Sequence, residues 1–226
     1  MVLASPAPPQ PTTQLAIGEK RVLLQGLNWE SYQQILQALP QSRAARLTYD
    51  RGTLEITVPL ENHEFALHLI SQFIRILVSE LDWELKTMGS TTINREGLNR
   101  GAEPDCAFYI QNQAIVVGRT VDFAKDPPPD LVVEIDITHT DIDKDQLYAA
   151  MEIPEFWRYN GQALSIFQLK DGAYQESDRS GIFEWIEKED LYQFLADSEQ
   201  GEIKAEKKFR ADIQKKLQQL GQSSNT

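Results

Sequence analysis

One segment, residues 131–137, constrains the fold more than any other stretch of the chain, because it combines an apolar run with two acids. Read as a strand, it has one apolar face and one face with both acids: Leu131, Val133 and Ile135 against Val132, Glu134 and Asp136. The apolar density predicts a strand covered on both sides, and the turn-rich stretch 126–130 precedes it. Acids at such a position are costly unless a cation or a shared proton compensates them.

The surrounding sequence is also rich in acids. From Glu103 to Glu155 there are twelve acidic residues and three basic ones, Arg119, Lys125 and Lys144. Such a density of negative charge indicates that the folded protein binds a cation in this region.

Hydrophobic periodicity predicts several further elements. The longest is a helix over 61–81 with one apolar stripe, and Asn28 is expected to cap a helix from Trp29 to about residue 39. The others are hairpins at 46–58 and 156–169, strands at 83–88, 104–110 and 182–186, and helices from Thr140 or Asp141 to about 151, at 190–196 and at 202–220.

This order predicts an α/β (α+β) fold, in which a mixed β-sheet is flanked by helices, with an N-terminal helix and β-hairpin and a C-terminal helix. The proline-rich residues 1–15 are expected to be a disordered arm, residues 16–200 the domain, and residues 201–226 an amphipathic helix and tail. The tail carries six basic residues, which touch nucleic acid or, as is more usual for such a helix, lie beside an apolar face packed on its own domain or on a second subunit.

Composition excludes several classes of protein. With 22 basic and 34 acidic residues, the net charge of −12 argues against a charge-driven grip on nucleic acid by the whole molecule. The single cysteine, Cys106, excludes an internal disulfide framework, and no apolar run is long enough to span a membrane. We therefore expect a cytoplasmic protein. No phosphate-binding loop is present, and His63-Glu64 lacks the second histidine of a zinc protease motif.

The residues that remain are Pro104-Asp105, then Glu134-Ile135-Asp136, then Lys144 at the start of a helix. This arrangement resembles the PD-(D/E)XK nuclease superfamily. The stretch 127–134 (PPPDLVVE), Asp143-Lys144, Tyr148 and the segment 153–157 (IPEFW) resemble more specifically a family of uncharacterised bacterial restriction-endonuclease-like proteins, abundant in cyanobacteria. The similarity extends from about Leu27 to Leu195.

The resemblance implies a restriction-endonuclease-like fold and a site for Mg²⁺ or Mn²⁺. Asp105 and Glu134 would supply the metal-binding carboxylates, and the backbone carbonyl of Ile135 a further ligand. The superfamily lysine is expected two residues after Glu134, where this chain has Asp136, so the resemblance assigns the lysine's role to Lys144. Carboxylates that hold Mg²⁺ and a nearby ammonium group are the components that phosphodiester hydrolysis requires.

Other residues have secondary roles in this hypothesis. Glu64 is a possible extra metal ligand, His63 lies nearer the inward side of its helix, and Asp136 is a candidate partner of Lys144. Alternatives are an ordinary turn role for Asp105 and a solvent-exposed ion pair for Lys144.

The predicted function is that of a metal-dependent endonuclease acting on DNA, with weak and salt-sensitive binding and a homodimeric state. The main alternative is an inactive binding module of the same fold, whose acidic face binds a cation or a basic protein. A hydrolase of smaller phosphoesters is a third possibility.

Overall fold

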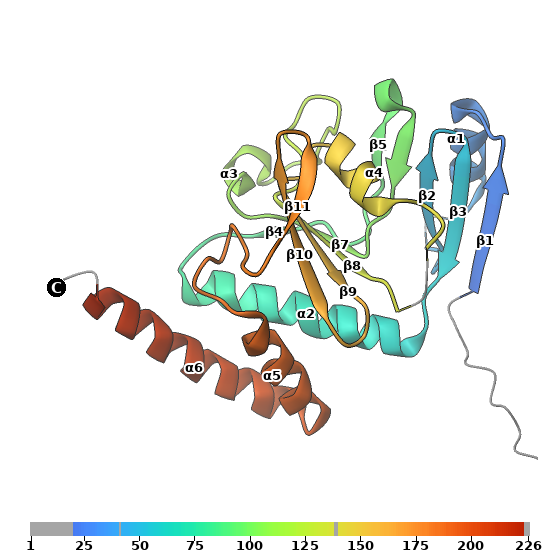
Figure 1. Cartoon of the computed structure of the whole chain (residues 1–226). Helices are drawn as coiled ribbons and strands as arrows, with labels where there is room; N and C mark the ends of the chain where they lie inside the picture. The colour runs from blue at the N-terminus through green and yellow to red at the C-terminus, as the bar shows by residue number, and fades with distance from the viewer. Residues whose placement is uncertain (1–19, 41, 138–139, 224–226) are drawn as a thin grey trace, which may run out of the picture.

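The protein contains two β-sheets in a computed structural model that describes residues 20–40, 42–137 and 140–223, and strands β1, β2 and β3 of the smaller sheet lie at one end of the molecule (Figure 1). In the described residues, the smaller sheet has five strands in the order β1 (Lys20–Gln25), β3 (Thr53–Val58), β2 (Arg46–Asp50), β6 (Arg100–Ala102), β5 (Ile93–Arg95). The larger sheet has six in the order β11 (Ala173–Ser177), β10 (Leu164–Lys170), β9 (Glu155–Tyr159), β8 (Leu131–Ile135), β7 (Cys106–Tyr109), β4 (Lys86–Thr87). The expected mixed α+β architecture is confirmed.

The five predicted helices form in the predicted order along the chain. The helices are α1 (Trp29–Ala38), α2 (Glu61–Glu80), the short α3 (Gln113–Val116), α4 (Lys144–Ala150), α5 (Lys188–Glu199) and α6 (Glu202–Ser223), with a 3₁₀ turn at Glu96–Leu98. The short helix α3 is an addition that the sequence did not predict. None of the helices within the described ranges is long and apolar enough to cross a membrane.

The N-terminal helix and hairpin form as expected. The Asn28 side chain accepts a hydrogen bond from the backbone N–H of Ser31 at 2.8 Å, which caps α1. The turn between β2 and β3 contains Arg51 and Gly52, both in the left-handed region with φ of 44° and 104°. Such a turn matches the twist of a two-stranded hairpin. Tyr32 of α1 then packs against the apolar face of this sheet.

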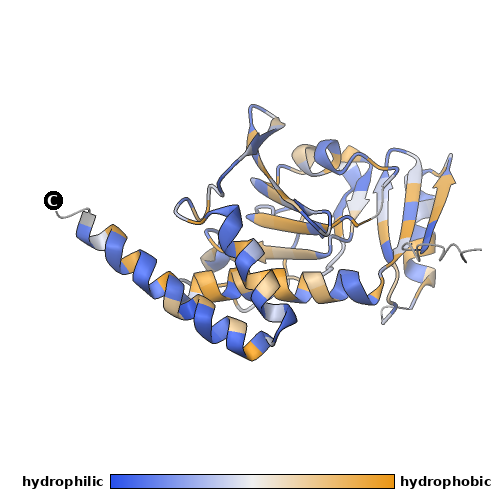
Figure 2. Cartoon of the chain, turned by 60° about the horizontal axis from the view of Figure 1, so that its bottom comes forward, coloured by the Kyte–Doolittle hydropathy of each residue, from blue (hydrophilic) through white to orange (hydrophobic). Residues whose placement is uncertain are grey.

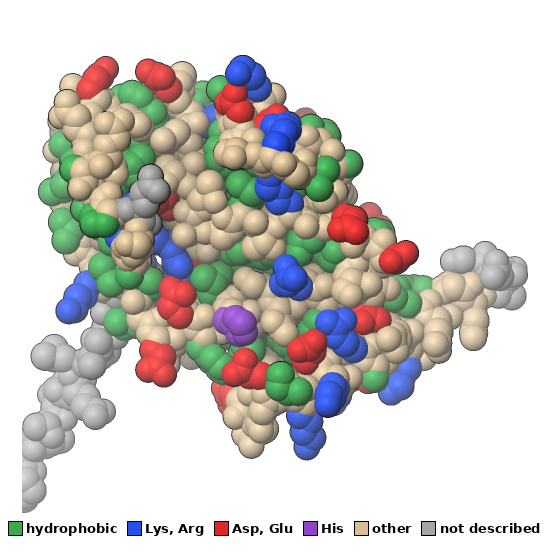
Figure 3. Space-filling view, turned by 180° about the vertical axis from the view of Figure 1, so that it is seen from behind, with side chains coloured by type: hydrophobic (Ala, Val, Ile, Leu, Met, Phe, Trp, Pro, Cys, Tyr) green, Lys and Arg blue, Asp and Glu red, His purple; other side chains and the backbone are tan. Residues whose placement is uncertain are grey.

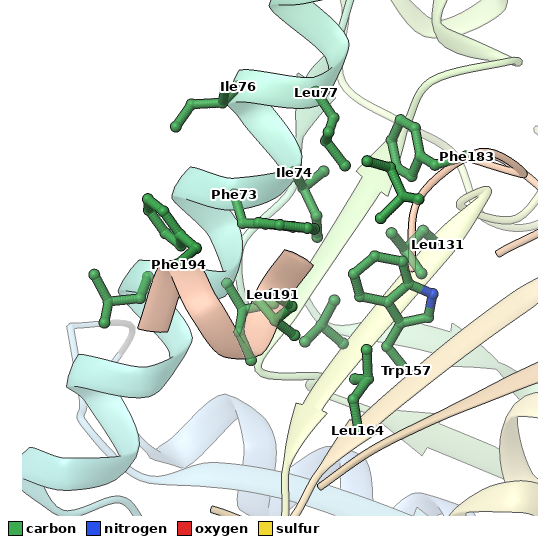
Figure 4. Packing of buried hydrophobic residues seen from close by; sticks show 14 of the residues in the cluster. Phe73, Ile74, Ile76, Leu77, Leu131, Trp157, Leu164, Phe183, Leu191 and Phe194 are labelled. Carbon is green, nitrogen blue, oxygen red and sulfur yellow. The ribbon is translucent and has the colours of Figure 1, made fainter. Parts of the chain in front are cut away.

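Helix α2 covers one face of the larger sheet, and the predicted apolar stripe is buried there. Figure 4 shows residues of α2, including Phe73 and Leu77, directed toward the sheet residues Leu131 and Trp157 and toward α5. Helix α4 lies on the opposite face, where Tyr148 packs near Phe156 at a ring-centroid distance of 5.2 Å. The central strand β8 is therefore covered on both faces, as its composition predicts.

Strand β8 pairs with β7 in antiparallel and with β9 in parallel orientation. A parallel pair needs a crossover connection, and α4 lies on the crossover between β8 and β9. This topology places the first turn of α4 close to the end of β8.

Several predictions about individual strands and helix ends are wrong, and β1, β5 and β6 form where no strand was predicted. No strand forms at 182–186, where Ile182, Phe183 and Ile186 instead pack into the large core from a loop. The last strand of the sheet is β11, which the sequence reading missed. The strand expected at 83–88 is reduced to β4, and α4 begins at Lys144 because Asp143 caps it by accepting from the Gln146 N–H at 3.1 Å.

The C-terminal helix α6 packs on its own domain. Ala205, Phe209 and Ile213 are buried in the large core beside α2 and α5. Arg210 binds Glu80 of α2 at 2.8 Å, and Lys216 binds Asp190 of α5 at 2.6 Å. In Figure 2 most of α6 is hydrophilic, with hydrophobic residues interspersed. Several basic residues of the C-terminal helix are thus paired with acids. The disordered arm expected at residues 1–15 lies outside the described residues.

Candidate active site

The two principal carboxylates come from neighbouring strands of the larger sheet. Asp105 directly precedes β7 and Glu134 lies in β8, and the pairing of Cys106 with Val133, extended by one residue, sets Asp105 opposite Glu134. Both are buried, with exposed fractions of 6% and 3%. Directly opposed residues of adjacent strands project from the same face of a sheet, so these two acids share one environment.

Three donors hold the carboxylate of Asp105. His63 Nε2 is 2.9 Å from Oδ2, the backbone N–H of Ile135 donates to the same oxygen at 2.7 Å, and Arg46 Nη1 donates to Oδ1. Burial by itself raises the pKa of Asp105, but the hydrogen bond with His63 and the charge of Arg46 outweigh it and lower the pKa to about 2. Asp105 is therefore ionised in the folded protein at neutral pH.

Glu134 is in the opposite electrostatic situation. Its Oε2 accepts from Lys144 Nζ at 2.7 Å, and its Oε1 accepts from the hydroxyl of Tyr148. Burial raises the pKa of Glu134 to about 7, with further contributions from the charges of Asp105 and Asp136, although Lys144 counteracts them. The pKa of Glu134 is thus raised mainly because its carboxylate is buried, and the folded protein retains this proton up to about neutral pH.

Lys144 is buried and directed into the site, so its interpretation as a solvent-exposed ion pair is wrong. Its exposed fraction is 7%, and Nζ donates to Glu134 at 2.7 Å and to Asp136 Oδ1 at 2.8 Å. Burial would lower the pKa of Lys144, but the charges of Glu134 and Asp136 raise it above the usual value. The Asp143 cap makes Lys144 the first residue of α4, which explains how it reaches the end of β8.

Asp136 also lies next to a second cation. Its Oδ2 is 3.3 Å from Nε of Arg158, an ion pair without hydrogen-bond geometry. The guanidinium of Arg158 lies over the ring of Phe156 at 5.1 Å and donates to Asp145 at 2.5 Å. Asp136 occupies the position where the superfamily pattern has its lysine, and here it contacts the lysine from α4.

The remaining predicted residues divide between the interior and the surface. His63 is buried, whereas the Glu64 side chain is 51% exposed and accepts from Arg46 Nη2 at 3.0 Å. The N–H of Ile135 is directed to Asp105, and since N–H and C=O of one strand residue point to the same side, the Ile135 carbonyl faces that side too.

Sequence reasoning gave no role to two residues that contact the carboxylates. Tyr148 was part of the motif, and its position four residues after Lys144 places both on one side of α4. Arg46 gave no signal, because it lies 59 residues from Asp105 and begins a strand of the other sheet. Only the folded arrangement of the two sheets brings it to the site.

The carboxylate oxygens of Asp105 and Glu134 are ligand atoms of the kind that a small divalent cation binds. Among the described residues, no group of three or more His, Cys, Asp and Glu side chains is arranged to hold a metal ion. Mg²⁺, however, commonly uses one or two carboxylates and retains several waters. A carboxylate has about four acceptor positions, so Asp105 with three donors and Glu134 with two retain capacity for a cation.

Two cavities border this cluster. One of about 500 Å³ is lined by Lys144, Asp136, Arg158 and neighbouring residues of the loop before α4. The other, of about 820 Å³, is lined by Arg46, Glu64, Arg43 and the hydroxyl residues Ser90, Thr91 and Thr92. The buried carboxylates are thus flanked by Lys144 on one side and by Arg46 on the other.

Comparisons with known proteins give one family match. The sequence model of a family described as "Uma2: Putative restriction endonuclease" matches residues 29–195, which contain every residue of this cluster. No curated protein matches the chain. Among solved structures, the crystal structure of a putative nuclease belonging to DUF820 from Anabaena variabilis is 14% identical, with a TM-score of 0.49, and the alignment covers 74% of this chain and 97% of that chain.

Proposed function

Since this chain belongs to the Uma2 family of putative restriction endonucleases, we propose that it is a metal-dependent endonuclease that hydrolyses phosphodiester bonds of DNA. The membership confirms the resemblance that the sequence motifs carry and supports a nuclease-like function. The finer assignment depends on the cluster of Asp105, Glu134 and Lys144. The observation that supports it best is the buried lysine ammonium, 2.7 Å from Glu134, beside a second buried acid on the neighbouring strand.

In this proposal Asp105, Glu134 and the Ile135 carbonyl hold Mg²⁺ or Mn²⁺. The ion, when bound, supplies a Lewis acid and lowers the pKa of a bound water. The three donors on Asp105 keep its carboxylate ionised and fix its orientation. The hydroxyl of Tyr148 and the ammonium of Lys144 each donate to one oxygen of Glu134 and fix the orientation of its carboxylate.

Lys144 acts as a charge and not as a base. Because the neighbouring acids raise its pKa above the usual value, the ammonium stays protonated at neutral pH. A protonated lysine donates hydrogen bonds to an attacking water or to phosphoryl oxygens, where negative charge develops in the transition state. Asp136 holds this ammonium from the other side and positions it.

DNA binding is expected to be weak and sensitive to salt. The net charge is −12, and on the face seen in Figure 3 acidic and basic side chains are interspersed and form no broad positive surface. The attraction of a polyanion must therefore come from a few local cations and from the bound metal. We also propose that the protein is a homodimer, because two subunits can cut the two strands of a duplex. Measurement of the molecular mass in solution tests this.

The test compares wild type with Glu134→Gln on double-stranded, single-stranded and branched DNA at low salt, with Mg²⁺, with Mn²⁺ and with a chelator. The change removes a ligand charge but retains volume, so we expect loss of cleavage with the fold preserved. Glu155→Gln is the matched control. Glu155 lies in the adjacent strand β9 and is 2% exposed, so it is as buried as Glu134. Its carboxylate accepts hydrogen bonds from Trp157 Nε1 and Ser180 Oγ, each at 2.6 Å, and neither of these partners belongs to the candidate site.

The second candidate function is a catalytically inactive module that uses the acidic cluster to bind a cation or a basic protein partner. One observation favours it: side chains and backbone of the protein itself already supply donors to each oxygen of Asp105 and Glu134. Absence of cleavage on every substrate would support this alternative over the nuclease. Calorimetry then separates its two forms, because metal binding without cleavage indicates a cation-binding module and absence of metal binding leaves a basic protein partner.

A further inference from the structure

The guanidinium of Arg46 lies between two carboxylates at the wall of the larger cavity. Nη1 donates to Asp105 Oδ1, and Nη2 donates to Glu64 Oε1 at 3.0 Å. Arg46 begins β2, Glu64 lies in the first turn of α2, and Asp105 precedes β7, so three separate elements meet at this side chain. One monovalent cation joins a buried carboxylate to an exposed one.

The charge around Arg46 is predominantly negative. Burial alone would lower the pKa of Arg46, but the charges of Asp105, Glu64 and Glu134 raise it. The side chain of Arg46 is 16% exposed and that of Asp105 is 6% exposed, so water screens the interaction between these two little, whereas Glu64 is 51% exposed and its interaction is screened more strongly. A divalent cation at the same place would carry twice the charge and would meet the oxygen donors that Mg²⁺ and Mn²⁺ prefer.

We propose that Arg46 occupies, in the ion-free protein, the position that a divalent cation takes between Asp105 and Glu64, so that cation binding requires the arginine side chain to leave. This inference rests on the proposed function, because it concerns the same metal centre. Glu64, the extra ligand expected from the sequence, is then one of the ligands, since its exposed carboxylate is already directed to the point where the guanidinium stands.

The cavity beside Arg46 provides space for the displaced side chain. It measures about 820 Å³ and is lined by the hydroxyl residues Ser90, Thr91 and Thr92 and by Glu103. The hydroxyl and carboxylate oxygens of these residues can accept hydrogen bonds from a guanidinium. The resting arrangement therefore competes with the metal, and the apparent metal affinity is lower than the carboxylates alone would give.

The experiment is calorimetric titration of Mn²⁺ into the full-length wild type, Arg46→Gln, Arg46→Lys and Arg43→Gln, without DNA. Removing the competing charge is expected to strengthen Mn²⁺ binding by about tenfold in Arg46→Gln, within the range usual for coupled binding. Arg46→Lys retains the charge but cannot bridge both carboxylates, so a smaller gain is expected. Arg43→Gln is the matched control: Arg43 lines the same cavity but binds Glu103, and wild-type affinity is expected.

Thermal melts report whether each variant is folded. Equal or weaker Mn²⁺ binding by folded Arg46→Gln would overturn the inference, as would an equal gain in Arg43→Gln. Should Arg46→Gln fail to fold, Arg46→Lys decides: tighter binding than wild type supports the inference, and equal or weaker binding overturns it. Failure of the proposed function is measured separately, as absence of DNA cleavage by the wild type, whereas absence of Mn²⁺ binding by the wild type and by both Arg46 variants overturns the inference.

Discussion

The raised pKa of Glu134 predicts that the protein loses stability as the pH rises through the weakly acidic range. Glu134 has an ordinary pKa of 4.5 in the unfolded chain and about 7 in the folded protein. Between these values the unfolded chain releases its proton while the folded protein retains it. Stability from this group is therefore fully present below pH 4.5 and is lost as the pH approaches 7.

The size of the effect follows from the shift. A shift from 4.5 to about 7 corresponds to roughly 3 kcal/mol at about 1.4 kcal/mol for each pH unit. Asp105 contributes in the opposite direction and in a separate window, because its folded pKa of about 2 lies below the ordinary value of 3.8. Its stabilisation is present above pH 3.8 and disappears as the pH falls toward 2, so the two groups do not obscure each other.

The assay is urea denaturation of wild type and Glu134→Gln from pH 4.5 to 7.5 in the presence of a chelator. Glutamine does not titrate, so the difference in the free energy of unfolding between the two proteins should change by roughly 3 kcal/mol across this range. The relative stability of the variant should rise with pH. If the free energies of unfolding of the two proteins changed in parallel with pH, the raised pKa of Glu134 would be refuted.

Three further predictions test the neighbouring parts of the structure. Tyr148→Phe removes the hydroxyl that donates to Glu134, so we expect a loss of about 1 kcal/mol in urea denaturation and slower cleavage; unchanged values would exclude its positioning role. Phe209→Ala removes a buried ring stacked on Phe73 at 4.7 Å, and a loss of about 3–5 kcal/mol is expected in the same assay; an effect below about 1 kcal/mol would contradict the packing of α6. Lys144→Met should abolish cleavage, whereas retained activity of a folded variant would remove the lysine from the mechanism.

Local patterns were sufficient for the elements that bury one regular face. The stripe of α2, the Asn28 cap and the alternation of β8 each depend on residues within a few positions of one another, so their signals survive in the sequence. Glu134 could be identified for the same reason, because its neighbours in the sequence are apolar. A buried carboxylate needs a cation, a proton or a hydrogen-bond donor wherever its strand lies in the fold.

Elements whose state depends on distant partners were misread. Ile182, Phe183 and Ile186 form an apolar run typical of a strand, but they fill the core from a loop after β11 has already completed the edge of the sheet. β1 was missed because its side chains are mainly exposed and its structure comes from pairing with β3. Pairing between strands is a tertiary contact, and local composition reports it weakly.

The sequence by itself determined which residues carry the acids and lysine of the site, and that these charges must meet a compensating partner. Only the tertiary structure decided which partners they meet. The crossover through α4 brings Lys144 to Glu134, the arrangement of the two sheets brings Arg46 to Asp105, and the first turn of α2 brings His63 to the same carboxylate. The physical reason is that a charge acts through space over a few ångströms, whereas the chain separates Arg46 from Asp105 by 59 residues.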